Sequence, residues 1–135
     1  MSPQLDFSYE FQYRYIGNHF LPALDVTLVG PSGEDDLVAI IDTGAEFSLF
    51  NGLRAPAIGL DLTAGRRQIL GGLAGQLIAW IHEVDLEIFG ARFRCEVAFS
   101  DHPIPRELLG RYTFFTQVCI AFREGISAVY FDPRP

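Results

Sequence analysis

Apolar and polar residues alternate along the first part of the chain, and a period of two is typical of a half-buried β-strand. The alternation covers Phe7, Tyr9, Phe11, Tyr13 and Tyr15. The segment 24–28 alternates in the same way, and the Gly-, Pro- and acid-rich segment 30–36 follows it as a solvated turn. The continuous apolar run 37–41 comes next, as expected for a strand buried on both faces. These patterns predict a hairpin whose second strand ends at Ile41.

Strands are also predicted along the rest of the chain. Residues 47–51 return to an extended pattern, whereas residues 52–63 contain Pro56 and Gly59 and are predicted to be irregular. Apolar residues flank three glycines in the segment 69–76, which predicts a hairpin tip that bends and admits a close backbone approach. The remaining predictions are strands over 78–88 and 93–99, a short helix over 112–118, and a closing hairpin over 118–131. The pattern therefore predicts an all-β chain with one short helix in its C-terminal half.

Length and composition fit one packed domain. The chain has 135 residues, which is enough for one domain with its own core and too few for two domains of ordinary size. Hydrophobic residues make up 49% of the chain and charged residues 20%, which is far from the composition of disordered proteins. We therefore expect a single domain over residues 1–135.

The charge excludes one class of partner. The formal net charge is −7 and the sequence contains no basic stripe, so the protein as a whole would repel a phosphate backbone. We expect no binding to nucleic acid.

No apolar run reaches the roughly 18 to 20 residues that a membrane span needs, and we expect a cytoplasmic protein with no membrane partner. Cys95 and Cys119 lie in apolar segments, where we expect two buried, reduced thiols rather than a disulfide.

The sequence Asp42-Thr43-Gly44-Ala45 directly follows the apolar run 37–41. A strand here would deliver one carboxylate, one hydroxyl and a tight glycine turn to a single point. The chain contains one such loop, whereas two carboxylates that share a proton require two aspartates. If this loop is catalytic, the active form is a homodimer.

Three features now stand in a fixed order: the strand with Asp42-Thr43-Gly44-Ala45, the glycine-rich tip at 70–75, and Leu-Leu-Gly-Arg at 108–111. In residue types and spacing, from about Val26 to Phe122, the chain resembles the retropepsins, the single-domain aspartic proteases of retroviruses and their cellular relatives. The resemblance implies a closed or partly open β-barrel and an aspartic endopeptidase that acts on extended peptides. It also implies that no metal and no other cofactor is needed.

The resemblance assigns catalytic roles to the first motif. Asp42 would pair with its twin across the dimer axis, so that one carboxyl group acts as base and the other as acid. Thr43 would tie the two loops together across the axis. Gly44 and the small Ala45 would let the substrate backbone lie close to the aspartates.

The resemblance also implies the residues that bind substrate. The residues that would form a flap over the peptide are Leu70, Gly71, Gly72, Leu73, Ala74 and Gly75. The residues that would line side-chain pockets are Ile104, Arg106, Leu108 and Leu109. These pockets suggest a preference for large apolar side chains, to which Arg106 would add an acidic preference. Glu46 and Arg111 are expected to form an ion pair near the active site.

The chain departs from the family pattern at two places. Tyr112 stands where many relatives have Asp or Asn, and the chain continues well beyond Phe122, near which the viral chains end. We therefore expect a dimer that is built differently from the viral one.

Other interpretations of these residues stay open. The fold can serve as an inactive dimerisation or peptide-binding module, Asp42 can cap a turn, and the glycine-rich tip can be a plain β-turn. His19, His82 and His102 lack the spacing of metal ligands and are expected to be structural. The acidic residues 34–36 and the pair Arg66-Arg67 are expected to be solvated charges, and Asp101-His102 is assigned to a loop.

Overall fold

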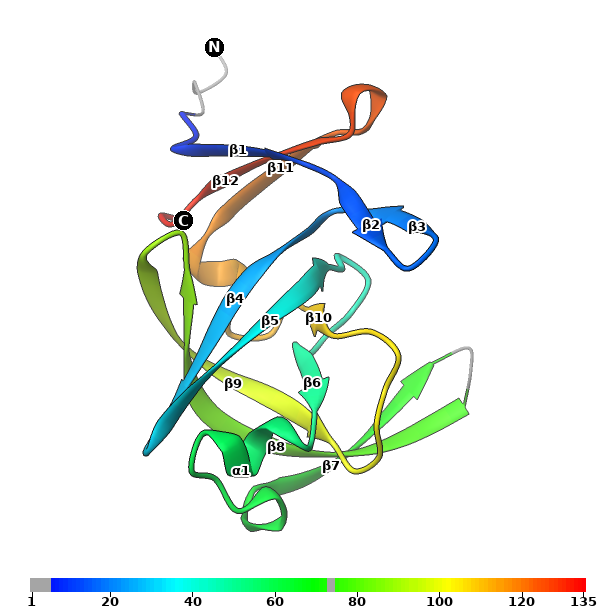
Figure 1. Cartoon of the computed structure of the whole chain (residues 1–135), viewed down its shortest axis with the longest axis vertical. Coiled ribbons are helices and arrows are strands. Elements are labelled where there is room, and N and C mark those ends of the chain that lie inside the picture. Colours follow the sequence, from blue (N-terminus) through cyan, green and yellow to red (C-terminus); the bar gives the residue numbers. More distant parts are fainter. Residues whose placement is uncertain (1–5, 73–74) are drawn as a thin grey trace.

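A computed structural model of the chain describes residues 6–72 and 75–135 and confirms the all-β prediction. The largest sheet has the strand order β4-β5-β10-β6-β9-β8-β7, and β4 also pairs with β8 (Figure 1). The strands of this sheet are β4 Ala23–Gly30, β5 Gly33–Ile41, β6 Leu49–Asn51, β7 Arg66–Gly72, β8 Gly75–Ile88, β9 Ala91–Ser100 and β10 Leu108–Leu109. Because β4 pairs with both β5 and β8, the two sides of the sheet curve toward each other around a common core.

The β4–β5 hairpin forms as predicted, with Gly30 opposite Gly33 at its turn. Every second side chain of β4 points into the core, where Val26 and Leu28 are almost completely buried. On β5, the prediction of burial on both faces is wrong at Val38, which is 38% exposed. Successive side chains of a strand point to opposite faces, and the outer face of the hairpin is open to solvent at this position.

A second sheet covers one end of the molecule (Figure 1). It has the order β1-β12-β11 and is antiparallel throughout, with β1 at Tyr9–Gln12, β11 at Cys119–Arg123 and β12 at Ala128–Asp132. β11 and β12 form the predicted closing hairpin, and the short 3₁₀ turn Glu124–Ile126 joins them.

The strand predicted from the aromatic alternation over 7–15 is divided in two. After β1, the chain continues into β2 (Arg14–Ile16), which forms a separate hairpin with β3 (His19–Leu21). Tyr13 lies at the division and is buried. Its amide donates to the carbonyl of Ser127, and its hydroxyl donates to the carboxylate of Glu124. These bonds fix the direction in which the chain leaves the terminal sheet.

The core fills the inside of the curved large sheet and extends to the terminal sheet. Its largest fully buried side chains include Phe50, Phe99, Phe114 and Phe131. Each of them comes from a different part of the chain, so the core joins β6, β9, the segment before β11, and β12. Burial of these aromatic rings supplies a large share of the hydrophobic stabilisation.

Helices are short in the part of the chain that the structure describes. The predicted helix over 112–118 forms as a single 3₁₀ turn, Phe115–Gln117. The α-helix α1 lies instead at Arg54–Ala57, inside the segment predicted to be irregular, and a 3₁₀ turn follows at Leu62–Ala64. None of the helices among the described residues is long and apolar enough to cross a membrane.

Candidate active site

Asp42 lies immediately after β5, beside β10, which runs parallel to β5. The Asp42 amide donates a hydrogen bond to the carbonyl of Leu109 at 3.0 Å. The pairing with β10 therefore fixes the main chain up to and including Asp42. Beyond it the chain turns: Oδ1 of Asp42 accepts a hydrogen bond from the amide of Gly44 at 2.9 Å, and the Asp42 carbonyl accepts one from the amide of Ala45. Asp42 is half-buried, whereas Thr43 and Gly44 are exposed. A fixed carboxylate is thereby presented at the surface of the chain.

The loop after Asp42 is fastened to the segment that follows β10. The carbonyl of Ala45 accepts from the amide of Arg111, and the carbonyl of Glu46 accepts from the amide of Tyr112. The buried hydroxyl of Ser48 accepts a hydrogen bond from the amide of Gly110 at 3.0 Å. These bonds make the 42–48 loop and the 109–112 segment one rigid unit.

The main chain at Gly110 lies so close to the main chain of Phe47 and Ser48 that a glycine is required there. A Cβ atom at Gly110 would lie 2.4 Å from the carbonyl oxygen of Phe47 and 2.9 Å from the amide nitrogen of Ser48. No side chain fits there without a shift of backbone. The Gly-Arg motif is visible in the sequence, but Ser48 is not, because a serine in an extended segment gives no signal that its hydroxyl will be buried against a distant amide.

A cleft of about 1100 Å³ opens in front of Asp42. Its lining comes from the 42–48 loop and the first residue of β6, from both strands of the β7–β8 hairpin and from the segment around β10. The lining residues are Asp42, Gly44, Ala45, Glu46, Phe47, Leu49, Gln68, Ile69, Leu70, Gly71, Gly75, Leu77, Arg106, Leu108 and Arg111. The cleft therefore gathers most of the residues singled out in the sequence and adds Phe47, Leu49, Gln68, Ile69 and Leu77.

Some residues singled out in the sequence lie elsewhere. Leu109 is completely buried in the core, because side chains alternate along β10 and that of Leu108 takes the cleft side. Ile104 is half-buried, and its main chain is held by the side chain of Asn51. Thr43 is exposed and does not line the cleft. Leu73 and Ala74 lie outside the described residues.

The expected ion pair between Glu46 and Arg111 is not formed. In the part of the chain that the structure describes, no salt bridge joins the two side chains, and both are exposed at the cleft. The two segments are joined through main-chain hydrogen bonds instead. The charges of both residues therefore remain available at the cleft surface.

The glycine-rich tip belongs to the β7–β8 hairpin, which projects from the large sheet (Figure 1). Its strands pair from Arg66 opposite Ile81 to Gly72 opposite Gly75, and Gly75 has φ of +110°. A Cβ atom at Gly71 would meet nothing within 4 Å. Packing within the chain therefore does not require a glycine at position 71.

The wall of the cleft near Arg106 is supported by an ion network. The guanidinium of Arg54 binds the carboxylate of Glu107 at 2.6 Å and that of Asp35 at 2.9 Å. Glu107 also accepts a hydrogen bond from the amide of Asn51, and its own carbonyl accepts one from the amide of Ile40. The network joins α1, β5 and the loop that leads into β10.

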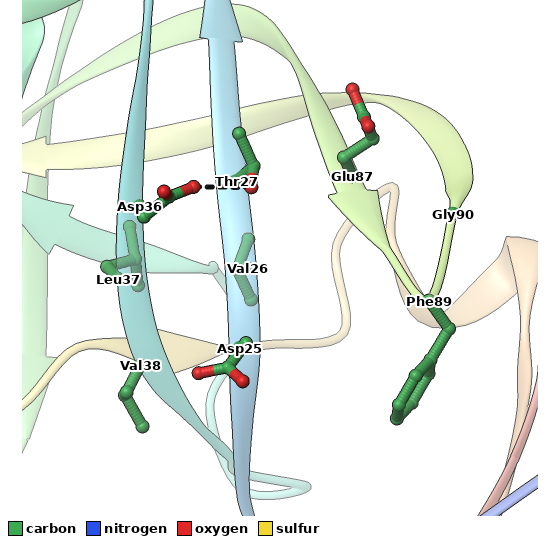
Figure 2. A pocket seen from close by; sticks show the side chains of 9 residues that line it. All are labelled: Asp25, Val26, Thr27, Asp36, Leu37, Val38, Glu87, Phe89 and Gly90. Atoms are coloured by element: carbon green, nitrogen blue, oxygen red, sulfur yellow. Dashed lines mark hydrogen bonds between the residues drawn. The ribbon is translucent and has the colours of Figure 1, made fainter.

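A second hollow, of about 520 Å³, lies on the outer face of the β4–β5 hairpin and beside the β8–β9 turn. Figure 2 shows three carboxylates around it, with Asp36 pointing toward Thr27. All three are already engaged: Asp36 accepts from the Thr27 hydroxyl, Asp25 pairs with Arg14, and Glu87 pairs with Arg92. We therefore assign no chemistry to this hollow.

The described residues contain no group of three or more His, Cys, Asp or Glu side chains placed to hold a metal ion. His82 has a structural hydrogen bond, with Nε2 2.8 Å from the carbonyl oxygen of Leu62. His102 is exposed and lies 3.6 Å from the carboxylate of Asp101. Arg66 has an exposed pairing with Glu96 at 3.7 Å.

The comparison with known proteins rests on the fold. No family model matches the sequence, and no curated protein matches it. Among solved structures, the chain is similar to EIAV protease complexed with the inhibitor HBY-793, with a TM-score of 0.53 and 20% sequence identity. The likeness covers 73% of this chain and 88% of that chain. The chain therefore has an all-β fold of the retropepsin type, in agreement with the resemblance found in its sequence.

Proposed function

We propose that this protein is an aspartic endopeptidase that acts as a homodimer and hydrolyses peptide bonds with the two Asp42 carboxyl groups. The observation that supports this most strongly is the placement of Asp42. Its carboxylate is fixed at the end of β5 by main-chain bonds and opens onto a large cleft under a projecting hairpin. One protomer supplies one half of the required pair.

In the proposed reaction the two carboxyl groups hold one proton and one water molecule between them. Two carboxylates about 3 Å apart cannot both ionise, which is the established behaviour of aspartic proteases. The ionised group takes a proton from the water as its oxygen attacks the peptide carbonyl carbon, and the protonated group donates its proton to the carbonyl oxygen. The tetrahedral intermediate then loses its C–N bond as the nitrogen is protonated, which releases a carboxylic acid and an amine.

The cleft suits an extended peptide. Its side-chain lining is largely apolar, with Phe47, Leu49, Ile69, Leu70, Leu77 and Leu108 on different sides. The open space at Gly71 leaves room for a substrate backbone against the hairpin. Arg106 and Arg111 add two exposed cations. We therefore propose substrates with large apolar side chains beside the cleaved bond and an acidic side chain within reach of these arginines.

A second candidate function is a non-catalytic module that binds an extended peptide in the same cleft. The observation that favours it is the hydrogen bond between Oδ1 of Asp42 and the amide of Gly44, which stabilises a turn without any chemistry. Peptide binding through main-chain pairing would need the cleft and the hairpin but no second aspartate.

Peptide cleavage by a matched pair of variants separates the two functions. Asp42→Asn keeps the shape of the side chain but can neither hold nor transfer the shared proton, so turnover is expected to fall by about a thousandfold or more. Asp61→Asn, which changes the same chemical group at an exposed position before the 3₁₀ turn at 62–64, is the control and is expected to keep full activity. A pepstatin-like inhibitor should bind the wild-type protein and not Asp42→Asn, because it mimics the transition state. Turnover retained by Asp42→Asn would refute the proposed function, whereas peptide binding without turnover in the wild type would establish the module.

A further inference from the structure

The β2–β3 hairpin leaves an aromatic face open to solvent. It forms a two-stranded sheet of its own in which Tyr15 lies directly opposite Phe20, with ring centroids 4.9 Å apart. Tyr15 is 70% exposed and Phe20 45% exposed. A two-stranded hairpin is marginally stable in water, and a pair of large exposed rings adds to the apolar surface that a partner can cover.

The hairpin has a well-defined shape. Gly17 has φ of +60° and opens a two-residue turn, which is the glycine position of a tight hairpin turn. At the base of the hairpin, Arg14 pairs with Asp25 of β4 at 2.9 Å. The aromatic face is therefore presented on an anchored and regular element.

The base of the hairpin is next to the catalytic aspartate. Pro22 follows β3, and its carbonyl accepts a hydrogen bond from the amide of Ile41 at 2.9 Å. Ile41 is the residue before Asp42. In the homodimer of the proposed function, on which this step depends, the two Asp42 carboxyl groups share a proton, so the two-fold axis passes beside them. Elements that flank Asp42 then lie close to the partner subunit.

A second copy of this chain meets no charge repulsion at the hairpin. Residues 11–24 contain no acidic residue, whereas the rest of the chain carries all 17 Asp and Glu residues. Arg14 is already paired with Asp25, so the aromatic face is close to neutral and can approach a chain whose net charge is −7.

From these observations we infer that the β2–β3 hairpin is a dimerisation arm whose Tyr15–Phe20 face packs against a second copy of this chain. The arm adds contact area beside the paired aspartates, and the dimer depends on it.

Sedimentation equilibrium of three proteins tests the arm. The double variant Tyr15→Ser/Phe20→Ser removes both rings, and Leu53→Ser removes an equally exposed apolar side chain (75% exposed) that lies beside α1. The double variant is expected to raise the dimer dissociation constant at least tenfold, whereas Leu53→Ser leaves it within twofold of the wild-type value. Equal dissociation constants for all three proteins would overturn the inference. Circular dichroism checks that each variant is folded. If the double variant does not fold, the single variant Tyr15→Ser is measured in its place.

Hydrogen exchange gives a second measurement on the unaltered protein. The amides of residues 14–21 are expected to exchange more slowly at concentrations above the dissociation constant than below it, and concentration-independent exchange would count against the arm. The experiments distinguish failure of the dimerisation arm from failure of the proposed function. A dimer that needs Tyr15 and Phe20 but cleaves no peptide keeps the arm and refutes the peptidase, and an active dimer insensitive to both substitutions does the reverse. A wild-type protein that stays monomeric at every concentration refutes both.

Discussion

Arg54 and Glu107 form a two-point contact, Nε to Oε2 and Nη2 to Oε1, with both distances 2.6 Å. The two residues are 53 positions apart in the sequence and belong to α1 and to the loop before β10. Their side chains are 24% and 10% exposed, so the pair is mostly shielded from water. The contact holds the loop that places Arg106 in the wall of the cleft.

We expect Glu107→Gln to lower the free energy of unfolding by about 2 kcal/mol, because it leaves the mostly buried guanidinium of Arg54 without its main counter-charge. Urea unfolding monitored by the fluorescence of Trp80 measures the change. The control is Arg94→Gln, which breaks the pairs of Arg94 with Glu83 and Asp85 around a guanidinium that is 58% exposed. Its effect is expected to stay below about 1 kcal/mol. Equal losses in the two variants would show that burial does not strengthen the Arg54 pair.

Gly110→Ala is expected to destabilise the protein by about 1 to 3 kcal/mol, because the new Cβ atom would force backbone apart at Phe47. The same shift would displace the loop that follows Asp42 and lower the proposed peptidase activity. Gly71→Ala is the matched control, since its Cβ atom would enter open space. Thermal unfolding of both variants is the measurement. If Gly71→Ala proves the more damaging of the two, the contacts assigned to these glycines are incorrect.

Tyr13 gives the stability a dependence on alkaline pH. Burial raises the pKa of Tyr13 to about 12 from its ordinary value of 10.0, and the hydrogen bond to Glu124 and the charge of that carboxylate add to the effect. Because the folded-state pKa is raised, the stabilisation is fully present below pH 10 and is lost as the pH rises through about 12. Tyr13→Phe removes this component. Unfolding free energies measured between pH 9 and 12 are expected to fall more steeply for the wild type than for Tyr13→Phe, and parallel curves would contradict the assignment.

The two cysteines are free, and they are expected to react at different rates. Burial raises the pKa of the Cys95 thiol to about 12, and this side chain is 1% exposed, so it offers almost no thiolate to a reagent at neutral pH. Cys119 on β11 is half-buried. A thiol reagent such as DTNB should modify Cys119 first and reach Cys95 after unfolding. Cys119→Ser should therefore abolish the faster phase, and fast modification that persists in this variant would refute the prediction.

Much of the fold could be predicted because it depends on local patterns. The alternation at 24–28 and the apolar run 37–41 fixed the β4–β5 hairpin, and the glycines at 71, 72 and 75 marked the tip of the next hairpin. The helix α1 was missed because it has four residues, no side-chain cap and Pro56 in its centre. A pattern-based prediction has no signal for a helix that depends on tertiary contacts.

The sequence predicted the position of Asp42 at the end of a strand, and it predicted the surroundings of Asp42 less well. The motif located the aspartate, but which side of β10 faces the cleft depends on register, and this moved Leu109 into the core. The expected pairing of Glu46 with Arg111 is not formed among the described residues, and main-chain bonds join their segments instead. Arg54, Asp35 and Glu107 meet through the folding of three distant segments, and no spacing in the sequence indicates such a network.

The terminal sheet β1-β12-β11 is made from a single chain, and its strand β12 pairs on both sides within the protomer. A chain of this build completes this sheet and its own core without a strand from a second copy. In the proposed dimer, folding and assembly are then separate steps, and assembly follows mass action. For the proposed enzyme, the rate of cleavage at concentrations below the dissociation constant would rise with the square of the amount of protein, so that supply of the chain itself acts as the on-switch.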